Sequence, residues 1–216
     1  WEYDDSRGRR HAMLRVGQGW GHAHHDTLDL QVFAHGLPMT IDGGQRNGYS
    51  RPADSITAVH NLVEVDRRNW RGHSWVTALN DQEGARYLAA EATPPRNHPD
   101  VRLYRRQVAL IDVAEPGPEP AAGAAGLLLD KDQPAPDSYV FDVVRVAGGA
   151  THTYCFHGPI DDELLVNLEN PVVGAESMEP ADRDYVSRLA FSEEARAGTA
   201  PAVVEATWRF CRGPNV

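Results

Sequence analysis

Apolar and polar residues alternate along much of the chain, and this pattern is typical of β-strands. From Leu28 the even-numbered positions are apolar and the odd-numbered ones are mixed, as in a strand with one face toward a core. If this strand already begins at His22, the side chains of His22 and His24 lie on its inward face. The side chain of His25 then points the other way.

Further strands are predicted where similar runs are bounded by Gly, Pro, Asn or Asp. They cover residues 12–16, 56–66, 74–80, 85–91, 101–114, 139–147, 151–157 and 203–211. Gly148 and Gly149 predict a hairpin turn. The segment 180–198 is the best candidate for a short helix, and the Pro-, Ala- and Gly-rich segment 115–126 favours a surface loop. We therefore predict an all-β fold, a multi-stranded antiparallel β-sandwich with few short helices.

Composition narrows the class of protein. A chain of 216 residues is long enough for one large β domain or two small ones, each with a sizeable core. The formal net charge of −10 argues against nucleic acid as a partner, because that binding depends on Lys and Arg at the phosphates. No run of 18 apolar residues occurs, so we expect no membrane span.

The candidate chemistry is concentrated in histidines. Three of the ten histidines lie within residues 22–25. Asp42 follows His24 by 18 residues, and His60 follows Asp42 by 18, about one strand-turn-strand step, so these three side chains can meet on adjacent strands. Two imidazoles and a carboxylate suit zinc and leave a fourth position for water or substrate. The alternative is a set of hydrogen-bonded polar residues at a sheet edge or on the surface.

The order of these motifs resembles the central β-sandwich of the heparinase II/III-like polysaccharide lyases. Segment 21–44 contains a His-x-His-x-Asp run, a strand, Gly-x-Pro and an Asp-x-Gly turn, and a Val-His-Asn-Leu-Val strand follows at 59–63. The likeness continues through 104–108 and 139–158, so it covers most of residues 10–160. It implies a super-sandwich type of β-sandwich, which we expect to span residues 1–216 as one domain.

The resemblance also implies a reaction. Such lyases cleave acidic, uronate-containing polysaccharides, such as alginate or glycosaminoglycans, by β-elimination, which needs carboxylate neutralisation, a base and an acid. It suggests His22 and Tyr49 as catalytic residues and Arg46 as a substrate contact. The alternatives are a core histidine for His22 and ordinary loop residues for Arg46 and Tyr49. The zinc ligands that it implies are His24, Asp42 and His60.

Several other residues are candidates for supporting roles. His25 and Asp26 can act as outer hydrogen-bonding partners of the site, and Asn61 can support the strand that carries His60. His152 and His157 lie on opposite faces of a predicted strand. The arginines after the histidine run form either a solvated face or a binding groove; they are Arg46, Arg51, Arg67, Arg68 and Arg71.

Members of this family carry an upstream α/α toroid that supplies further catalytic groups. This chain contains no such helical domain, so we expect the toroid upstream or on a second chain, and little or no activity without it. The chain opens on Trp1 without a signal peptide, which suggests that an upstream segment has been removed or lies on another chain. The resemblance implies a secreted or periplasmic protein. Cys155 and Cys211 can form one disulfide or remain buried thiols.

Two other classes of protein fit parts of the pattern. The His22-x-His24 pair followed by Asp29 and Gly36 comes near a cupin motif, in which Asp29 rather than Asp42 would be a metal ligand. The second cupin motif is absent from the sequence. A non-catalytic carbohydrate-binding sandwich would instead use aromatic platforms, for which the candidates are Trp20, Trp70 and Trp75; these can also be core residues.

Overall fold

The structure is a computed structural model, and it describes most of the first 158 residues and short parts of the remainder. The described residues are 10–18, 23–34, 37–42, 55–82, 84–113, 138–158, 163–167, 173–174, 180, 184–185, 196–197 and 205–209. All pairs between its strands are antiparallel. Within this part of the chain there is no helix of seven or more residues, which confirms the predicted all-β fold.

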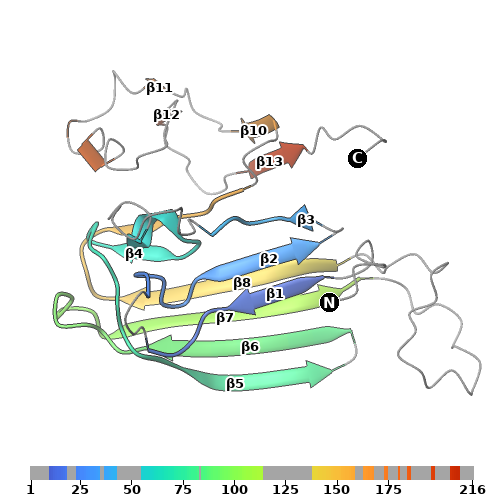
Figure 1. The fold of residues 1–216 in the computed structure, drawn as a ribbon, viewed down its shortest axis with the longest axis horizontal. Helices are drawn as coiled ribbons and strands as arrows, with labels where there is room; N and C mark the ends of the chain where they lie inside the picture. Colours follow the sequence, from blue (N-terminus) through green and yellow to red (C-terminus); the bar gives the residue numbers. More distant parts are fainter. Residues whose placement is uncertain are drawn as a thin grey trace, which may run out of the picture.

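The largest sheet has four strands that follow one another in chain order (Figure 1). They are β5 (Ser74–Gln82), β6 (Ala85–Ala92), β7 (Leu103–Asp112) and β8 (Ser138–Ala147). A smaller sheet is formed by β1 (His11–Leu14), β2 (Leu30–Ala34) and β3 (Leu37–Pro38). Strand β1 contacts β7, so the two sheets share a core.

Three two-stranded sheets complete the described strands. β4 (Val63–Val65) pairs with β9 (His152–Tyr154), β10 (Glu163–Asn167) with β13 (Glu205–Arg209), and β11 (Val173–Gly174) with β12 (Arg196–Ala197). The sequence pattern did not predict β3, β10, β11 or β12. In the part of the chain that the structure covers, no helix is both long and apolar enough to cross a membrane.

Residues on β7 alternate between inward and outward positions, and the inward ones pack against the smaller sheets to form the core. Tyr104, Arg106 and Val108 point inward at every second position and are buried. Trp70 is fully buried, and its ring and the Tyr104 ring are nearly perpendicular, with centroids 4.6 Å apart. The Tyr104 hydroxyl donates to the carbonyl oxygen of Val63 at 2.8 Å. The aromatic core therefore also attaches β4 to the large sheet.

The strand predicted from Leu28 starts at Leu30 as β2, and its suggested extension back to His22 is not present in the described residues 23–29. The backbone turns at Leu28, whose φ of 65° lies in the left-handed region. The amide of Asp29 closes this turn by donating to the carbonyl oxygen of Asp26. Leu28 adopts this unusual conformation while its side chain is fully buried.

The prediction of one continuous strand over 56–66 is also wrong. A single 3-10 turn, η3 (Thr57–Val59), precedes β4. Thr57 is fully buried, and its hydroxyl donates to the carbonyl oxygen of His25 at 2.8 Å and accepts from the amide of Trp70 at 2.6 Å. These hydrogen bonds between distant segments stabilise a turn where the alternation of apolar and polar residues predicted a strand. As a result, His60 lies at the end of a helical turn.

The glycine turn predicted after β8 is present, but it is not a hairpin. Gly148 and Gly149 have φ values of 100° and 80°, which other residues rarely adopt. Strand β8 pairs with β7, whereas β9 pairs with β4, so the turn connects strands of two different sheets. The predicted loop 115–126 and most of the predicted helix 180–198 lie outside the described residues. The helix prediction is wrong for residues 196–197, which form strand β12.

Candidate metal centre

Three side chains from distant parts of the sequence converge at one point. His24, Asp42 and His60 each offer a ligand atom, and these atoms all lie within 4.8 Å of one another. Nδ1 of His60 is 2.5 Å from Oδ1 of Asp42, and the rings of His24 and His60 have centroids 5.3 Å apart. The structure thus brings together the three residues whose spacing indicated a common site. Their binding of an ion stays a prediction.

The burial of the three side chains differs. His60 is fully buried, and its Nε2 atom has no hydrogen-bond partner among the described residues. The Asp42 side chain is 34% exposed, and His24 is partly buried. A ligand from solvent therefore reaches this cluster from the side of Asp42 and His24, whereas His60 closes its inner end.

The donor set fits zinc. Zinc bonds of 2.0–2.2 Å in a tetrahedral site place neighbouring donor atoms about 3.3 Å apart. The contact between His60 and Asp42 is shorter and has the length of a strong hydrogen bond. Small side-chain shifts would therefore separate these two donors enough to share an ion.

Two hydrogen bonds to the backbone of His25 hold the segment that carries His24. The amide of His25 donates to the carbonyl oxygen of Ser55 at 2.9 Å, and the hydroxyl of Thr57 donates to the carbonyl oxygen of His25 at 2.8 Å. Both bonds attach this segment to the turn that leads into His60. The relative position of His24 and His60 therefore depends on tertiary contacts rather than on strand pairing.

Asn61 connects the other segments of the site. It is fully buried, and its side-chain amide donates to the carbonyl oxygen of Ile41 at 2.9 Å. Its side-chain oxygen accepts from the amide of His157 at 2.7 Å, and its own backbone amide donates to Oδ1 of Asp29 at 2.7 Å. The sequence suggested that Asn61 supports His60, and in the structure it also fixes the residue before Asp42.

Arg106 is a supporting residue that sequence reasoning missed. Its side chain is fully buried on the inward face of β7, where it donates through Nη1 to the carbonyl oxygens of Leu28 and Asn61. Its other nitrogens form a two-point contact with the Asp142 carboxylate, at 2.9 and 2.8 Å. The sequence feature that could have indicated a buried Arg106 is its position in the predicted strand, on the same inward face as Tyr104 and Val108.

Burial shifts the ionisation of several neighbouring groups. It lowers the pKa of His25, with Arg71 acting in the same direction, and it lowers the pKa of His157. It raises the pKa values of Asp26 and Asp29. An ion pair of 2.7 Å with Arg15 opposes the shift of Asp26. His25 is partly buried and Asp26 is buried, and both are close in the chain to His24.

The other predicted site residues have different outcomes. His22, Arg46, Tyr49 and Arg51 lie outside the described residues. The ring of His157 bonds the carbonyl oxygen of Ala58 at 3.0 Å beside the cluster, whereas the ring of His152 bonds that of Gly148. Of the remaining arginines, Arg71 lies near His25, Arg67 lies over the ring of Tyr185, and Arg68 donates to the carbonyl oxygen of Asn97.

The geometry also bears on the alternative classes of protein. The carboxylate of Asp29 is buried and accepts hydrogen bonds from Asn61 and Gln31, so both of its oxygens have partners within the fold. This arrangement favours Asp42 over Asp29 as a ligand.

Among the proposed sugar platforms, Trp70 is a core residue, Trp75 is 42% exposed on β5, and Trp20 lies outside the described residues.

Comparison with models of known protein families and with curated proteins finds no match for this chain. The resemblance to the heparinase II/III-like lyases therefore rests on the motifs in the sequence. The convergence of His24, Asp42 and His60 is a separate observation that is compatible with it.

Proposed function

We propose that this protein is the β-sandwich portion of a polysaccharide lyase that cleaves an acidic, uronate-containing polysaccharide by β-elimination. Zinc held by His24, Asp42 and His60 would organise its site. The observation that carries the proposal is the convergence of these three side chains, in the order expected from the resemblance. A bound zinc ion would supply a fixed positive charge that holds the two imidazoles and the carboxylate in one arrangement.

The chemistry of elimination defines what the protein must provide. A base removes the proton at C5 of the uronate, and the electron pair forms a double bond between C4 and C5 as the C4–O bond breaks. An acid protonates the departing oxygen, so the products are an unsaturated uronate end and a free hydroxyl. His22 is the proposed acid or base in this chain, and Tyr49 and Arg46 are the proposed catalytic and substrate-binding loop residues.

The described residues support a division of labour within the site. His60 is fully buried, so its role is structural, while the more accessible Asp42 and His24 mark the side from which a polymer approaches. Asn61 and Thr57 hold the segments that carry these residues. The remaining groups for carboxylate neutralisation and proton transfer would come from a toroid domain upstream or on a second chain.

The direct test is an ultraviolet assay on alginates and glycosaminoglycans, with and without the toroid domain. We expect unsaturated ends, detected by absorbance of the conjugated double bond, when both parts are present. We expect little or no turnover by the 216-residue chain alone, because each missing catalytic group costs about 100-fold or more. In the complete enzyme, His22→Ala should abolish the absorbance while Asn80→Ala, on an exposed strand, should leave it unchanged.

Other outcomes would identify other functions. New reducing ends without ultraviolet absorbance would mean hydrolysis and would contradict the elimination mechanism. Polysaccharide binding without cleavage, even with the toroid present, would indicate a non-catalytic carbohydrate-binding sandwich. Full turnover by the isolated chain that His22→Ala abolishes would show that the sandwich carries a complete site and that no toroid is needed.

A further inference from the structure

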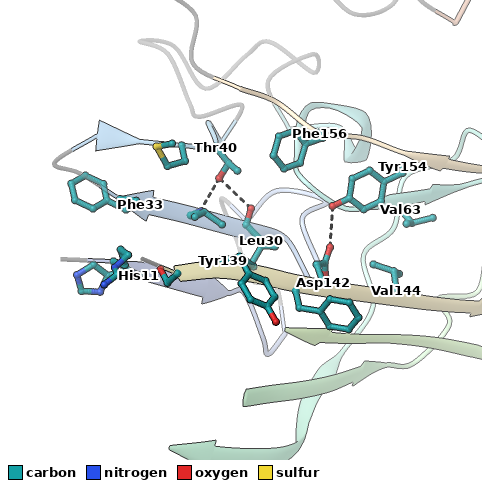
Figure 2. Close-up of a pocket in the computed structure, with 17 residues that line it drawn as sticks. His11, Leu30, Phe33, Thr40, Val63, Tyr139, Asp142, Val144, Tyr154 and Phe156 are labelled. Carbon is teal, nitrogen blue, oxygen red and sulfur yellow. Dashed lines mark hydrogen bonds between the residues drawn. The ribbon is translucent and has the colours of Figure 1, made fainter. Parts of the chain in front are cut away.

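A groove of about 820 Å³ is lined by residues of β2 and β8 (Figure 2). Its walls are mainly apolar and include Leu30, Val63 and Val144, while polar side chains such as Arg10 and Ser138 also line it. Pockets that bind small molecules have volumes of roughly 300–1,000 Å³ and combine apolar walls with a few polar groups. The groove therefore has the size and composition of a binding site.

Two aromatic rings form one wall of this groove. Tyr154 and Phe156 are two residues apart, their rings are within 14° of parallel, and the ring centroids are 6.4 Å apart. The two residues remain 49% and 41% exposed. Near-parallel rings at this separation are offset from each other, so part of each ring face can contact a ligand. Core aromatic residues such as Trp70 and Tyr104 are, in contrast, fully buried.

The ring of Tyr154 is held in place from behind. Its hydroxyl donates to Oδ2 of Asp142 at 3.0 Å and lies 3.3 Å from Nη2 of Arg106, as Figure 2 shows for the Asp142 contact. Arg106 is fully buried and itself bonded to Asp142, so this network is anchored in the core at Arg106. A ring that is fixed before binding loses little freedom when a ligand stacks on it, which favours affinity.

Two chain segments link the groove to the metal centre along the backbone. Thr40 lines the groove, and Asp42 of the metal cluster is two residues further along the same segment. Phe156 lies in the groove, and the carbonyl oxygen of the next residue, His157, accepts a hydrogen bond of 2.9 Å from the amide of Ile41. Residues that line the groove are therefore close in the chain to Asp42 and to the segment that is bonded to it through Ile41.

We propose that this groove is a carbohydrate subsite in which Tyr154 and Phe156 stack against the C–H faces of sugar rings of the polymer whose cleavage is proposed above. The inference rests on that proposed function for the identity of the polymer. Sugar rings have apolar faces and polar edges, and this combination matches aromatic platforms between apolar walls and polar side chains. The ion pair of Arg106 with Asp142 is neutral as a unit, so it does not repel an acidic chain.

The test is calorimetric titration of the full chain with short uronate oligosaccharides and with neutral gluco-oligosaccharides as probes. We expect Phe156→Ala to weaken binding by about tenfold, the scale of one lost aromatic contact. Tyr154→Phe keeps the ring and should bind nearly as well as the parent chain. Trp75→Ala is the matched control, because Trp75 is similarly exposed but lies on β5, at the other edge of the large sheet.

The outcomes separate the subsite from the reaction. Binding by the parent chain that Phe156→Ala leaves unchanged, or no binding of either probe, overturns the subsite. If the complete enzyme cleaves uronate polymers and Phe156→Ala leaves KM unchanged, the subsite is wrong and the lyase proposal stands. Binding of the neutral probe that depends on Phe156, without cleavage of uronate polymers, supports the subsite and contradicts the proposed reaction. A thermal melt of each variant confirms that it is folded.

Discussion

The side-chain amide of Asn61 donates a hydrogen bond of 2.9 Å to the carbonyl oxygen of Ile41. These two residues directly adjoin His60 and Asp42, whose side chains meet at 2.5 Å. One buried amide therefore fixes the distance between the two segments that supply His60 and Asp42 to the candidate metal centre. Asn61 also accepts from the amide of His157, so removing its side chain affects both neighbouring segments.

We expect Asn61→Ala to weaken zinc binding by about 10- to 100-fold, the usual effect of losing a residue that orients metal ligands. The change also leaves the Ile41 carbonyl and the His157 amide without their side-chain partner, at a cost of about 1–3 kcal/mol in the free energy of unfolding. Zinc competition with a coloured chelator and urea unfolding measure the two effects. Asn80→Ala, an exposed asparagine on β5, should change neither. Zinc affinity equal to that of the parent chain would contradict this role of Asn61.

The chain should bind about one zinc ion, and His60→Ala should remove it, because zinc sites of this kind use at least three protein ligands. Elemental analysis of the purified chain measures the bound metal. Asp29→Asn is the matched control, since the amide oxygen can still accept from the backbone amide of Asn61. Unchanged zinc in His60→Ala together with zinc loss in Asp29→Asn would instead favour the cupin-like ligand set.

Arg106→Met should destabilise the fold by about 3–5 kcal/mol, because it leaves the largely buried Asp142 carboxylate without its cation. Combining it with Asp142→Leu should cost less than the sum of the two single changes, since both remove the same pair. Urea unfolding gives the three free energies. Arg105→Met is the control: its ion pair with Glu91 involves a 41% exposed side chain, so we expect a loss of at most about 1 kcal/mol. Strictly additive losses would argue against the coupling of Arg106 and Asp142.

Cys155 is a free, buried thiol in the structure. Burial, together with the nearby Glu64 carboxylate, raises its pKa to about 11. Because the thiolate is the reactive form, a thiol reagent at pH 8 should modify the native protein slowly and the denatured protein rapidly. The measurement is made on the Cys211→Ser variant, so that the observed modification is that of Cys155. Rapid modification of the native chain would show that this thiol is accessible and ionised.

The same shift gives a pH dependence. The folded-state pKa of Cys155 lies above that of the unfolded chain, so the unfolded state releases its proton first as the pH rises. The contribution of this thiol to stability is therefore complete below about pH 8.5 and is lost as the pH rises toward 11. Unfolding free energies measured across this range should fall less steeply in the Cys155→Ser, Cys211→Ser variant than in Cys211→Ser. Equal slopes would contradict the assignment.

Much of the fold was predictable from the sequence, because strands depend on a local pattern. The alternation of apolar positions predicted β5 to β8 within about two residues of their observed ends. Sequence spacing also selected His24, Asp42 and His60 as residues that could meet, since their types and separations are visible without a structure. The turn at Gly148 and Gly149 was likewise predictable, because glycine favours positive φ.

Only the tertiary structure decided how these parts are connected. The turn at Leu28, the 3-10 turn before His60 and the pairing of β4 with β9 depend on contacts between residues far apart in the chain, such as Asn61 with His157. Arg106 shows the same dependence, because a charge on the inward face of a strand is stable only where Asp142 and two carbonyl oxygens are placed to receive it. Local periodicity carries no information about such partners, since burial and hydrogen bonding are satisfied by whichever segments pack together.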